Sequence, residues 1–320
     1  MTINDPLRRA VTASSVLVAL LLVGAAACAA KQQPKETVES LRQNSPTLQA
    51  IARNAKIRIA VRQDVPYMFY LDPKNPGARR TGFEIEIARA MATELGFGED
   101  LIEWVPIKTM PERLTVLQQN RADLVVANFS MTEEREKFVD FAGPYQLVPQ
   151  AVLVRRGRSR PIVTLEDLQG DDMRVCTTTG STAVAVLKAN EIKPRAVDTH
   201  LLCIDGLRSG AYDAFTGDLP ILAALAEAER SRTGTEIFEV LDLAIADQPE
   251  KIGVASPNND EAMRKVISWY LHKWQTAGAN SRWQLAYDRT IGPYLDEAYR
   301  SQPLVDNWPD LADYDAKAPR

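Results

Sequence analysis

The stretch LQQNRADLVVAN, Leu117–Asn128, ends a helical segment, turns, and begins a strand. A second stretch, LRSGAYDAFTGD at Leu207–Asp218, follows the same order: the end of a helix, a turn residue, an aspartate at the seventh position and then a strand. Two α/β lobes of similar build would produce this repetition, with Asn128 and Asp218 leaving equivalent strand ends. A chance likeness between two helix–strand units is the alternative, and the two stretches alone leave it open.

Strands and helices alternate along the chain. The β-branched run Ile57–Val61 predicts the first strand of the folded body, and Asp123–Ala127 predicts a later one. Between them, Phe83–Leu95 carries apolar residues at helical spacing and stops before Gly96. This alternation predicts an α/β fold with a largely parallel sheet.

The composition is that of a globular protein with room for two domains. The chain has 320 residues, of which 45% are hydrophobic and 25% are charged. Its formal net charge is -4, so no basic field indicates nucleic acid as a partner. The sequence contains no metal-ligand pattern such as H-E-x-x-H, and we predict neither a metal nor a cofactor.

The N-terminus has the three parts of a secretion signal. Arg8 and Arg9 precede an apolar run at residues 16–23, and the small residues GAAAC end at Cys28. The run is too short to span a bilayer comfortably. A cysteine in this place resembles a bacterial lipobox, so residues 1–28 are interpreted as a lipoprotein signal peptide with Cys28 as the lipidated residue. Ordinary secretion with an incidental cysteine is the alternative, and both export the protein.

Two further cysteines, Cys176 and Cys203, remain in a chain that would fold outside the reducing cytosol. A disulfide between them is the simple inference, and a pair of buried free thiols is the alternative. A catalytic cysteine is disfavoured, because His200 and His272 show no nucleophile–base arrangement. Residues 29–50 are polar and predict a tether between the anchor and the folded body, with a short helix at its end as one alternative.

Four stretches occur in the order seen in family 3 extracellular solute-binding proteins, the polar amino-acid receptors of ABC importers. They are GFEIEIARAMATELG, RADLVVANFSMTEEREKFVDFAGPY, TTTGSTA and GAYDAFTGDLPIL. The resemblance covers roughly Lys56 to Gly292, and its most specific part is the T-x-x-R-x-x-x-V-D-F-x-x-P-Y run at Thr132–Tyr145.

The resemblance implies a two-lobe periplasmic-binding-protein type II fold with two hinge strands. The chain would cross to the second lobe and return, so that the first lobe is discontinuous. The expected boundaries are 51–152 for the first part of lobe one, 153–252 for lobe two and 253–300 for the return segment. Residues 301–320 would form an irregular surface tail.

The resemblance also implies a site for the backbone of an amino acid. Arg135 would hold the α-carboxylate, and Asp218 would meet the α-ammonium. Asn128 and Ser130 would assist from the loop before Arg135, and a turn at a helix N-terminus would supply donors from Thr178, Ser181 and Thr182. A zwitterion needs such a bidentate cation with helix N–H groups at one end and a carboxylate at the other.

The side-chain pocket would set the substrate. By resemblance to glutamate and aspartate receptors, Arg62 and Arg113 would meet a distal carboxylate, with Thr109 beside Arg113. Asp64 would either pair with Arg62 or contact the ligand, and Tyr67 and Phe69 would wall the pocket. The alternative for both arginines is solvated surface charge.

These expectations describe a monomeric, lipid-anchored receptor outside the cytoplasm. It would deliver an acidic or amide amino acid (glutamate or aspartate, or else glutamine or asparagine) to an ABC permease. One alternative is a sensor that reports amino-acid levels to a membrane signalling partner. Another is an enzyme, since the fold also hosts dehydratases and a murein lytic class, but the zwitterion clamp of Arg135 and Asp218 favours binding without chemistry.

Overall fold

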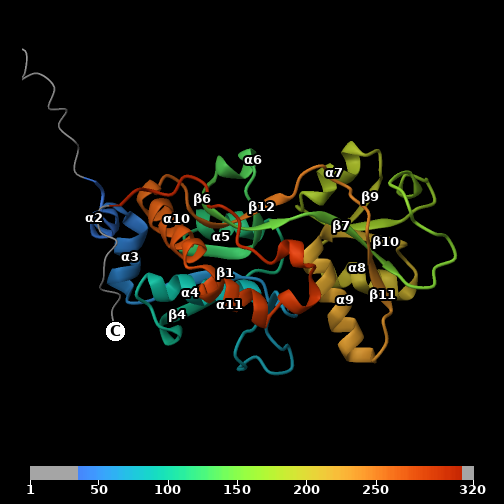
Figure 1. The fold of residues 1–320 in the computed structure, drawn as a ribbon, viewed down its shortest axis with the longest axis horizontal. Helices are drawn as coiled ribbons and strands as arrows, with labels where there is room; N and C mark the ends of the chain where they lie inside the picture. The colour runs from blue at the N-terminus through green and yellow to red at the C-terminus, as the bar shows by residue number, and fades with distance from the viewer. Residues whose placement is uncertain (1–34, 312–320) are drawn as a thin grey trace, which may run out of the picture. The chain divides into compact units, whose positions relative to one another are not determined.

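The computed structural model describes residues 35–311. The predicted signal peptide, the predicted lipidation at Cys28 and the tail beyond residue 311 lie outside the described residues. In the part of the chain that is described, no helix is long and apolar enough to cross a membrane. The predicted α/β class is confirmed, because helices surround two separate sheets (Figure 1).

The first sheet has five strands in the order β4-β1-β5-β12-β6. Strands β4 (Ile102–Pro106), β1 (Ile57–Val61) and β5 (Leu124–Ser130) are parallel to one another. Strand β12 (Glu250–Pro257) is antiparallel to both β5 and β6 (Val139–Val148). Every residue of β5 is buried, as expected for a strand that is covered on both faces.

The second sheet has the order β11-β7-β10-β8-β9 and repeats this plan. Strands β8 (Val175–Thr178), β9 (Pro194–Val197) and β10 (Ala214–Asp218) are parallel. Strand β7 (Gln150–Arg155) is antiparallel to β10 and to β11 (Phe238–Leu241). In each sheet, therefore, one strand (β5 or β10) separates the parallel strands from an antiparallel one.

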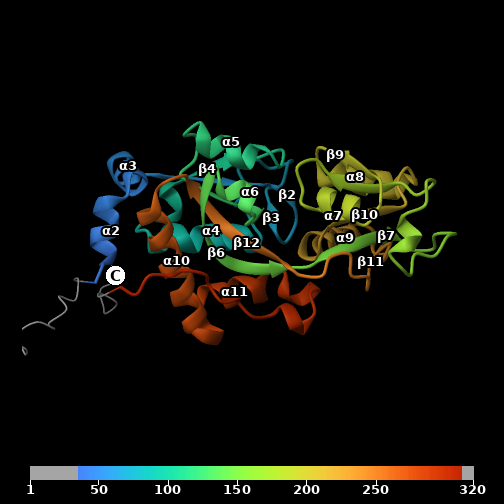
Figure 2. The ribbon, with the colours of Figure 1, turned by 90° about the horizontal axis from the view of Figure 1, so that it is seen from above.

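The chain passes between the sheets twice. Strand β6 continues through Pro149 into β7, and β12 returns beside β6 with Glu250 opposite Val148 (Figure 2). The expected boundaries at residues 152 and 252 fall inside the two strands β7 and β12 that make these crossings. The crossing strands are the hinge strands of the predicted type II fold.

The helices pack on the sheets according to the alternation of strand side chains. On β5, Leu124 and Val126 join a cluster with α4 (Phe83–Glu94), whereas Val125 and Ala127 join another with α5 (Glu112–Gln118). The first cluster also contains residues of α10 (Glu261–Thr276) and α11 (Arg282–Arg289). Around the second sheet lie α7 (Ala183–Ala189), α8 (His200–Ser209) and α9 (Leu219–Thr233). The shorter elements are β2 (Asp64–Val65), β3 (Phe69–Tyr70), α6 (Glu133–Glu136) and the 3-10 turns η2 (Glu99–Leu101), η3 (Glu166–Leu168), η4 (Gly278–Asn280), η5 (Gly292–Tyr294) and η6 (Glu297–Tyr299).

The segment expected to be a polar tether is helical over most of its described part. Helices α2 (Val38–Asn44) and α3 (Pro46–Asn54) occupy it, and their Leu41, Leu48 and Ile51 are buried. Ser45 caps α3 and donates from its hydroxyl to Asp260 at the start of α10, at 2.8 Å. The polar composition of the segment concealed these few apolar residues, which are enough to hold two short helices on the body.

The C-terminal segment 301–311 is irregular and packs on the first sheet. Its Val305 and Leu311 are buried. Asp306 donates its backbone N–H to the Gly143 carbonyl of β6 at 2.7 Å, and its carboxylate contacts the Lys251 ammonium of β12 at 2.7 Å. This segment therefore contacts β6 and β12, which lie beside each other where the chain crosses between the sheets.

The two repeated stretches form the same structure. Asp123 accepts the backbone N–H of Arg58 at 2.7 Å and also binds its guanidinium. Asp213 does the same for Arg174, with 2.9 Å between the backbone nitrogen and the carboxylate. Each aspartate ties the turn before one strand (β5 or β10) to the start of the neighbouring parallel strand, so the likeness of the two stretches is structural and not accidental.

The predicted disulfide is confirmed: Cys176 in β8 and Cys203 in α8 are bonded, with their Cα atoms 5.7 Å apart. Both residues are fully buried. The bond joins α8 to the sheet near the first residue of the helix, His200.

Candidate functional site

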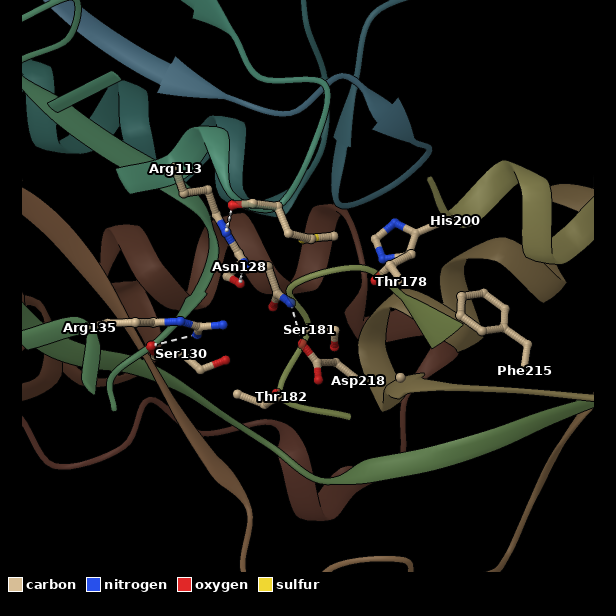
Figure 3. Close-up of a pocket in the computed structure, with 12 residues that line it drawn as sticks. Arg113, Asn128, Ser130, Arg135, Thr178, Ser181, Thr182, His200, Phe215 and Asp218 are labelled. Carbon is tan, nitrogen blue, oxygen red and sulfur yellow. Dashed lines mark hydrogen bonds between the residues drawn. The ribbon is translucent and has the colours of Figure 1, made fainter. Parts of the chain in front are cut away.

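A cavity lies where the carboxyl ends of β5 and β10 face one another (Figure 3). Open α/β sheets commonly bind ligands at such strand ends. The first lobe contributes Met110, Arg113, Asn128, Ser130 and Arg135 to the lining, and the second contributes Thr178, Ser181, Thr182, His200, Phe215, Gly217 and Asp218. The structure thus brings together eight of the predicted site residues, which come from five separate segments of the chain.

Asn128 has an unusual backbone conformation that a buried carboxylate supports. Its φ is 49°, which a non-glycine residue adopts at a cost. Both carboxylate oxygens of Glu84 accept its N–H, at 2.7 and 2.9 Å, and Glu84 also accepts the Tyr145 hydroxyl at 2.6 Å. Burial raises the pKa of Glu84 to about 7, against the opposing effect of these hydrogen bonds. Glu84 therefore shapes the end of β5 from behind the cavity.

The backbone of Arg135 lies in α6, a helix of only four residues, and its side chain points away from that helix. The Thr132 hydroxyl accepts the Arg135 N–H at 3.3 Å as the N-cap of α6. The guanidinium turns back to donate to the Ser130 carbonyl at 2.9 Å and to the Gly180 carbonyl of the other lobe at 3.1 Å. Burial lowers the pKa of Arg135, while the charges of Glu250 and Asp218 oppose that shift. The side chain remains a cation because the ordinary pKa of a guanidinium exceeds about 12.

Arg113 is the second guanidinium at the cavity and is almost completely buried. It donates to the carbonyls of Met110 at 3.1 Å and Asn128 at 2.6 Å. Its guanidinium carbon lies 4.6 Å from the centre of the Phe129 ring, and that of Arg135 lies 5.0 Å from the same centre. Within residues 35–311, neither arginine forms an ion pair with a carboxylate. Two cations at the cavity thus have carbonyl and ring contacts but no anionic partner.

Asp218 is the carboxylate that faces them, at the end of β10. Its oxygens accept hydrogen bonds from the side-chain amides of Asn128 and Gln150, so the last residues of the two repeated stretches touch each other. Burial, followed by the negative charge of Glu250, raises the pKa of Asp218 well above its usual range. A ligand cation would oppose that shift, since an opposite charge favours the ionised carboxylate.

The turn after β8 closes the cavity from the second lobe. Thr178 is buried, and the hydroxyl of Ser181 accepts the N–H of Ala183 at 3.2 Å as α7 begins. Gly180 between them has a φ of 77°. A Cβ at this glycine would lie 3.3 Å from Met110 and Pro111 of the other lobe, so the left-handed conformation and the close approach both favour glycine here.

The match to known families covers the residues that build this cavity. The family described as bacterial extracellular solute-binding proteins, family 3, matches residues 57–287. This chain belongs to that family. It is 28% identical to the glutamate-binding protein GluB of Corynebacterium efficiens, over 73% of this chain and 79% of that one.

Two further relatives have similar coverage. The ABC transporter glutamine-binding protein GlnH of Bacillus subtilis is 30% identical, over 79% of this chain and 88% of that one. Among solved structures, the solute receptor for L-cysteine of Neisseria gonorrhoeae matches with a TM-score of 0.66 and 26% identity, over 78% of this chain and 95% of that one. These relatives confirm the predicted type II fold and place this solute-binding protein among binding proteins and not enzymes.

The remaining predicted residues of this solute-binding protein lie outside the cavity lining. Arg62 is fully buried and pairs with Asp64, with 2.5 Å between Nη2 and Oδ2. Phe69 is buried beneath the Arg62 guanidinium, 5.5 Å from its carbon to the ring centre. Tyr67 packs against Tyr294, and Thr109 precedes Met110 without lining the cavity. Arg62 therefore pairs with Asp64, one of the two expectations for Asp64, and is not part of the cavity lining.

Four lining residues were not predicted: Met110, His200, Phe215 and Gly217. His200 accepts a hydrogen bond at Nδ1 from Arg62 Nη2, at 3.3 Å. Burial and the Arg62 charge lower the pKa of His200 to about 3, so the ring is neutral. His200 is the first residue of α8, shortly after β9 ends. This position was the available sequence signal, since the N-terminus of a helix often binds a ligand anion. In the described part of the chain, no cluster of three potential metal ligands occurs.

Proposed function

We propose that this protein captures an acidic amino acid, glutamate or aspartate, between its two lobes and delivers it to an ABC permease. Glutamine and asparagine are the next candidates. Arg135 binds the α-carboxylate, Asp218 binds the α-ammonium, and Arg113 faces the distal group. The ligands named for the glutamate- and glutamine-binding relatives support this class.

The observation that carries the proposal is the balance of charge at the cavity. Two guanidiniums, Arg113 and Arg135, lack a carboxylate within ion-pair distance in residues 35–311, and Asp218 is the acidic residue on the lining. A ligand with two carboxylates and one ammonium supplies the missing charges. A cationic ligand such as arginine would instead bring a third positive charge to a buried site, which is costly without a paired anion.

The imidazole of His200 adds a neutral hydrogen-bond donor. A guanidinium only donates, so Nδ1 of His200 must accept from Arg62, and the ring hydrogen of the neutral imidazole resides on Nε2. A neutral N–H donor suits the oxygen of a carboxylate and also that of an amide. This explains why glutamine and asparagine stay close behind the acidic amino acids as candidates.

Delivery and anchoring complete the proposal. The lining comes from both lobes, and Arg135 reaches across to Gly180, so a bound ligand would favour the closed arrangement of the lobes. A permease would then recognise the closed form at the membrane, to which lipidation of Cys28 would tether the protein. The family supports an extracellular location.

Isothermal calorimetry on the purified mature protein tests the ligand class. Glutamate or aspartate should bind most tightly, with glutamine and asparagine weaker. Tight binding of arginine with no binding of acidic ligands would overturn the proposal.

The variant Arg113→Met sharpens this test. It should weaken glutamate binding by about 10- to 100-fold, since a charge-assisted hydrogen bond is lost, and should weaken glutamine binding much less. The ratio of the two affinities separates loss of the charge from any general loosening of the site. Arg121→Met, at an exposed position of the same lobe, is the matched control and should leave the ratio unchanged.

A further inference from the structure

A chain of three polar side chains leads from the cavity to the hinge strands. The Gln150 side-chain nitrogen donates to Oδ1 of Asp218 and also to Oε1 of Glu250, the latter at 3.1 Å. Gln150 is the first residue of β7 and Glu250 is the first residue of β12. One amide thus joins two carboxylates at the point where the chain crosses between the lobes.

Two buried oxygen atoms of this chain have no hydrogen-bond partner in the described residues. The second carboxylate oxygen of Glu250 is buried and accepts no hydrogen bond within the described residues. The Oε1 atom of Gln150 is likewise buried without a partner. The negative charge of Glu250, joined to Asp218 through one amide, therefore disfavours ionisation of the buried Asp218 carboxyl.

The charged groups that face Asp218 come from several elements. Arg113 of α5 and Arg135 of α6 are cations, whereas Glu84 of α4 and Glu250 of β12 are acids. Arg135 interacts more strongly with Glu250 than with Asp218. If both guanidiniums bind carboxylates of a ligand, they no longer compensate Asp218 and Glu250, and only the ligand's ammonium can do so.

We propose that Asp218, at the cavity end of the Asp218–Gln150–Glu250 chain, holds a proton in the unliganded protein and releases it when the ligand's ammonium binds there. The inference rests on the proposed function. The O–H bond of the Asp218 carboxyl breaks, the electron pair stays on its oxygen, and the proton passes to solvent or buffer. Glu250 acts through Gln150 and Asp218 as a positioning residue, not through contact with the ligand.

The high pKa that burial and Glu250 give to Asp218 agrees with this geometry. Binding should strengthen as the pH rises, because release of a proton is then favoured, and should weaken as the pH falls. The neutral imidazole of His200 does not contribute a proton near neutral pH, since its pKa is lowered to about 3.

Calorimetry of glutamate binding at neutral pH, in phosphate and in Tris, tests the proposal. The two buffers differ in their heat of protonation. The binding heat should differ between them by the amount expected for about half a released proton, because a carboxyl with a pKa of about 7 is half protonated at neutral pH. Glu250→Gln keeps an oxygen that can accept from Gln150 but removes the charge, and should show a smaller difference in binding heat between the two buffers. Glu236→Gln, an exposed acid of the same lobe, is the matched control and should retain the wild-type difference.

Equal heats for the wild-type protein, or an undiminished difference in Glu250→Gln, would overturn the proposal while glutamate binding itself stands. Carboxyl NMR resonances of the unliganded protein supply a reading that needs no ligand. Asp218 should titrate well above the usual aspartate range, and its midpoint should fall in Glu250→Gln. Titration of Asp218 in the ordinary acidic range would overturn this proposal. Failure of the proposed function is a separate result, which calorimetry would show as the absence of amino-acid binding.

Discussion

At the seventh position of LQQNRADLVVAN, Asp123 binds the backbone and guanidinium of Arg58, and at the seventh position of LRSGAYDAFTGD, Asp213 binds Arg174 in the same way. Five residues later the two stretches differ. The first ends at Asn128 with a positive φ and an amide, and the second ends at Asp218 with a carboxylate that this amide contacts. The comparison teaches that the repeated aspartates build the sheets, whereas the unlike ends build the cavity.

The largest effect should separate the two aspartates of the second stretch. Asp218→Asn removes the carboxylate opposite the ammonium and should weaken amino-acid binding by more than about 100-fold, since a buried charge pair is lost. Asp213→Asn should leave affinity nearly unchanged and lower only the stability. Calorimetry together with chemical denaturation measures both, and a similar loss of affinity in the two variants would contradict the division of roles.

Of the two stretch ends, the first should make the more pH-dependent contribution to stability, because the ionisable Glu84 supports it. The pKa of Glu84 is raised in the folded protein to about 7 from 4.5, so the folded state holds a proton that the unfolded chain has released. Its contribution to stability is therefore full below about pH 4.5 and is lost as the pH rises through about 7.

Glu84→Gln should remove this dependence. Between pH 5 and 8, the wild-type free energy of unfolding should fall relative to the variant's by roughly 2–3 kcal/mol. Urea denaturation at both pH values measures the difference. Parallel pH profiles for the two proteins would show that Glu84 is not a protonated support of Asn128.

A smaller effect should distinguish the two repeated aspartates from each other. The side chains of Asp123 and Arg58 are 6% and 22% exposed, whereas those of Asp213 and Arg174 are 32% and 44% exposed. Asp123→Ala should cost about 2 kcal/mol of stability, since it leaves buried donors without a partner. Asp213→Ala should cost less than about 1 kcal/mol, because solvent can replace an exposed partner. Equal losses of stability in the two variants, measured by chemical denaturation, would show that the difference in burial does not set the cost of losing each aspartate.

The fold could be predicted well because its signals are local. Ile57–Val61 forms β1 with the predicted bounds, and the helix expected at Phe83–Leu95 runs from Phe83 to Glu94. At residues 38–54 the sequence indicated at most one short helix where the structure has two, because their three buried apolar residues stand among polar ones. The predicted residues that lie on a turn or at a strand or helix end, such as Arg135, Thr178 and Asp218, are the ones that line the cavity.

The sequence by itself predicted the order of strands and helices, and it indicated the repetition of one unit in two lobes and the pairing of the two cysteines. Each of these depends on residues close along the chain or on there being few partners to choose from. Only the tertiary structure decided that Arg62 pairs with Asp64 behind the cavity lining, whereas His200, 138 residues beyond Arg62, belongs to that lining. The physical reason is competition: a buried arginine pairs with whichever anion the fold brings within reach, and that choice is made in space between segments distant in sequence.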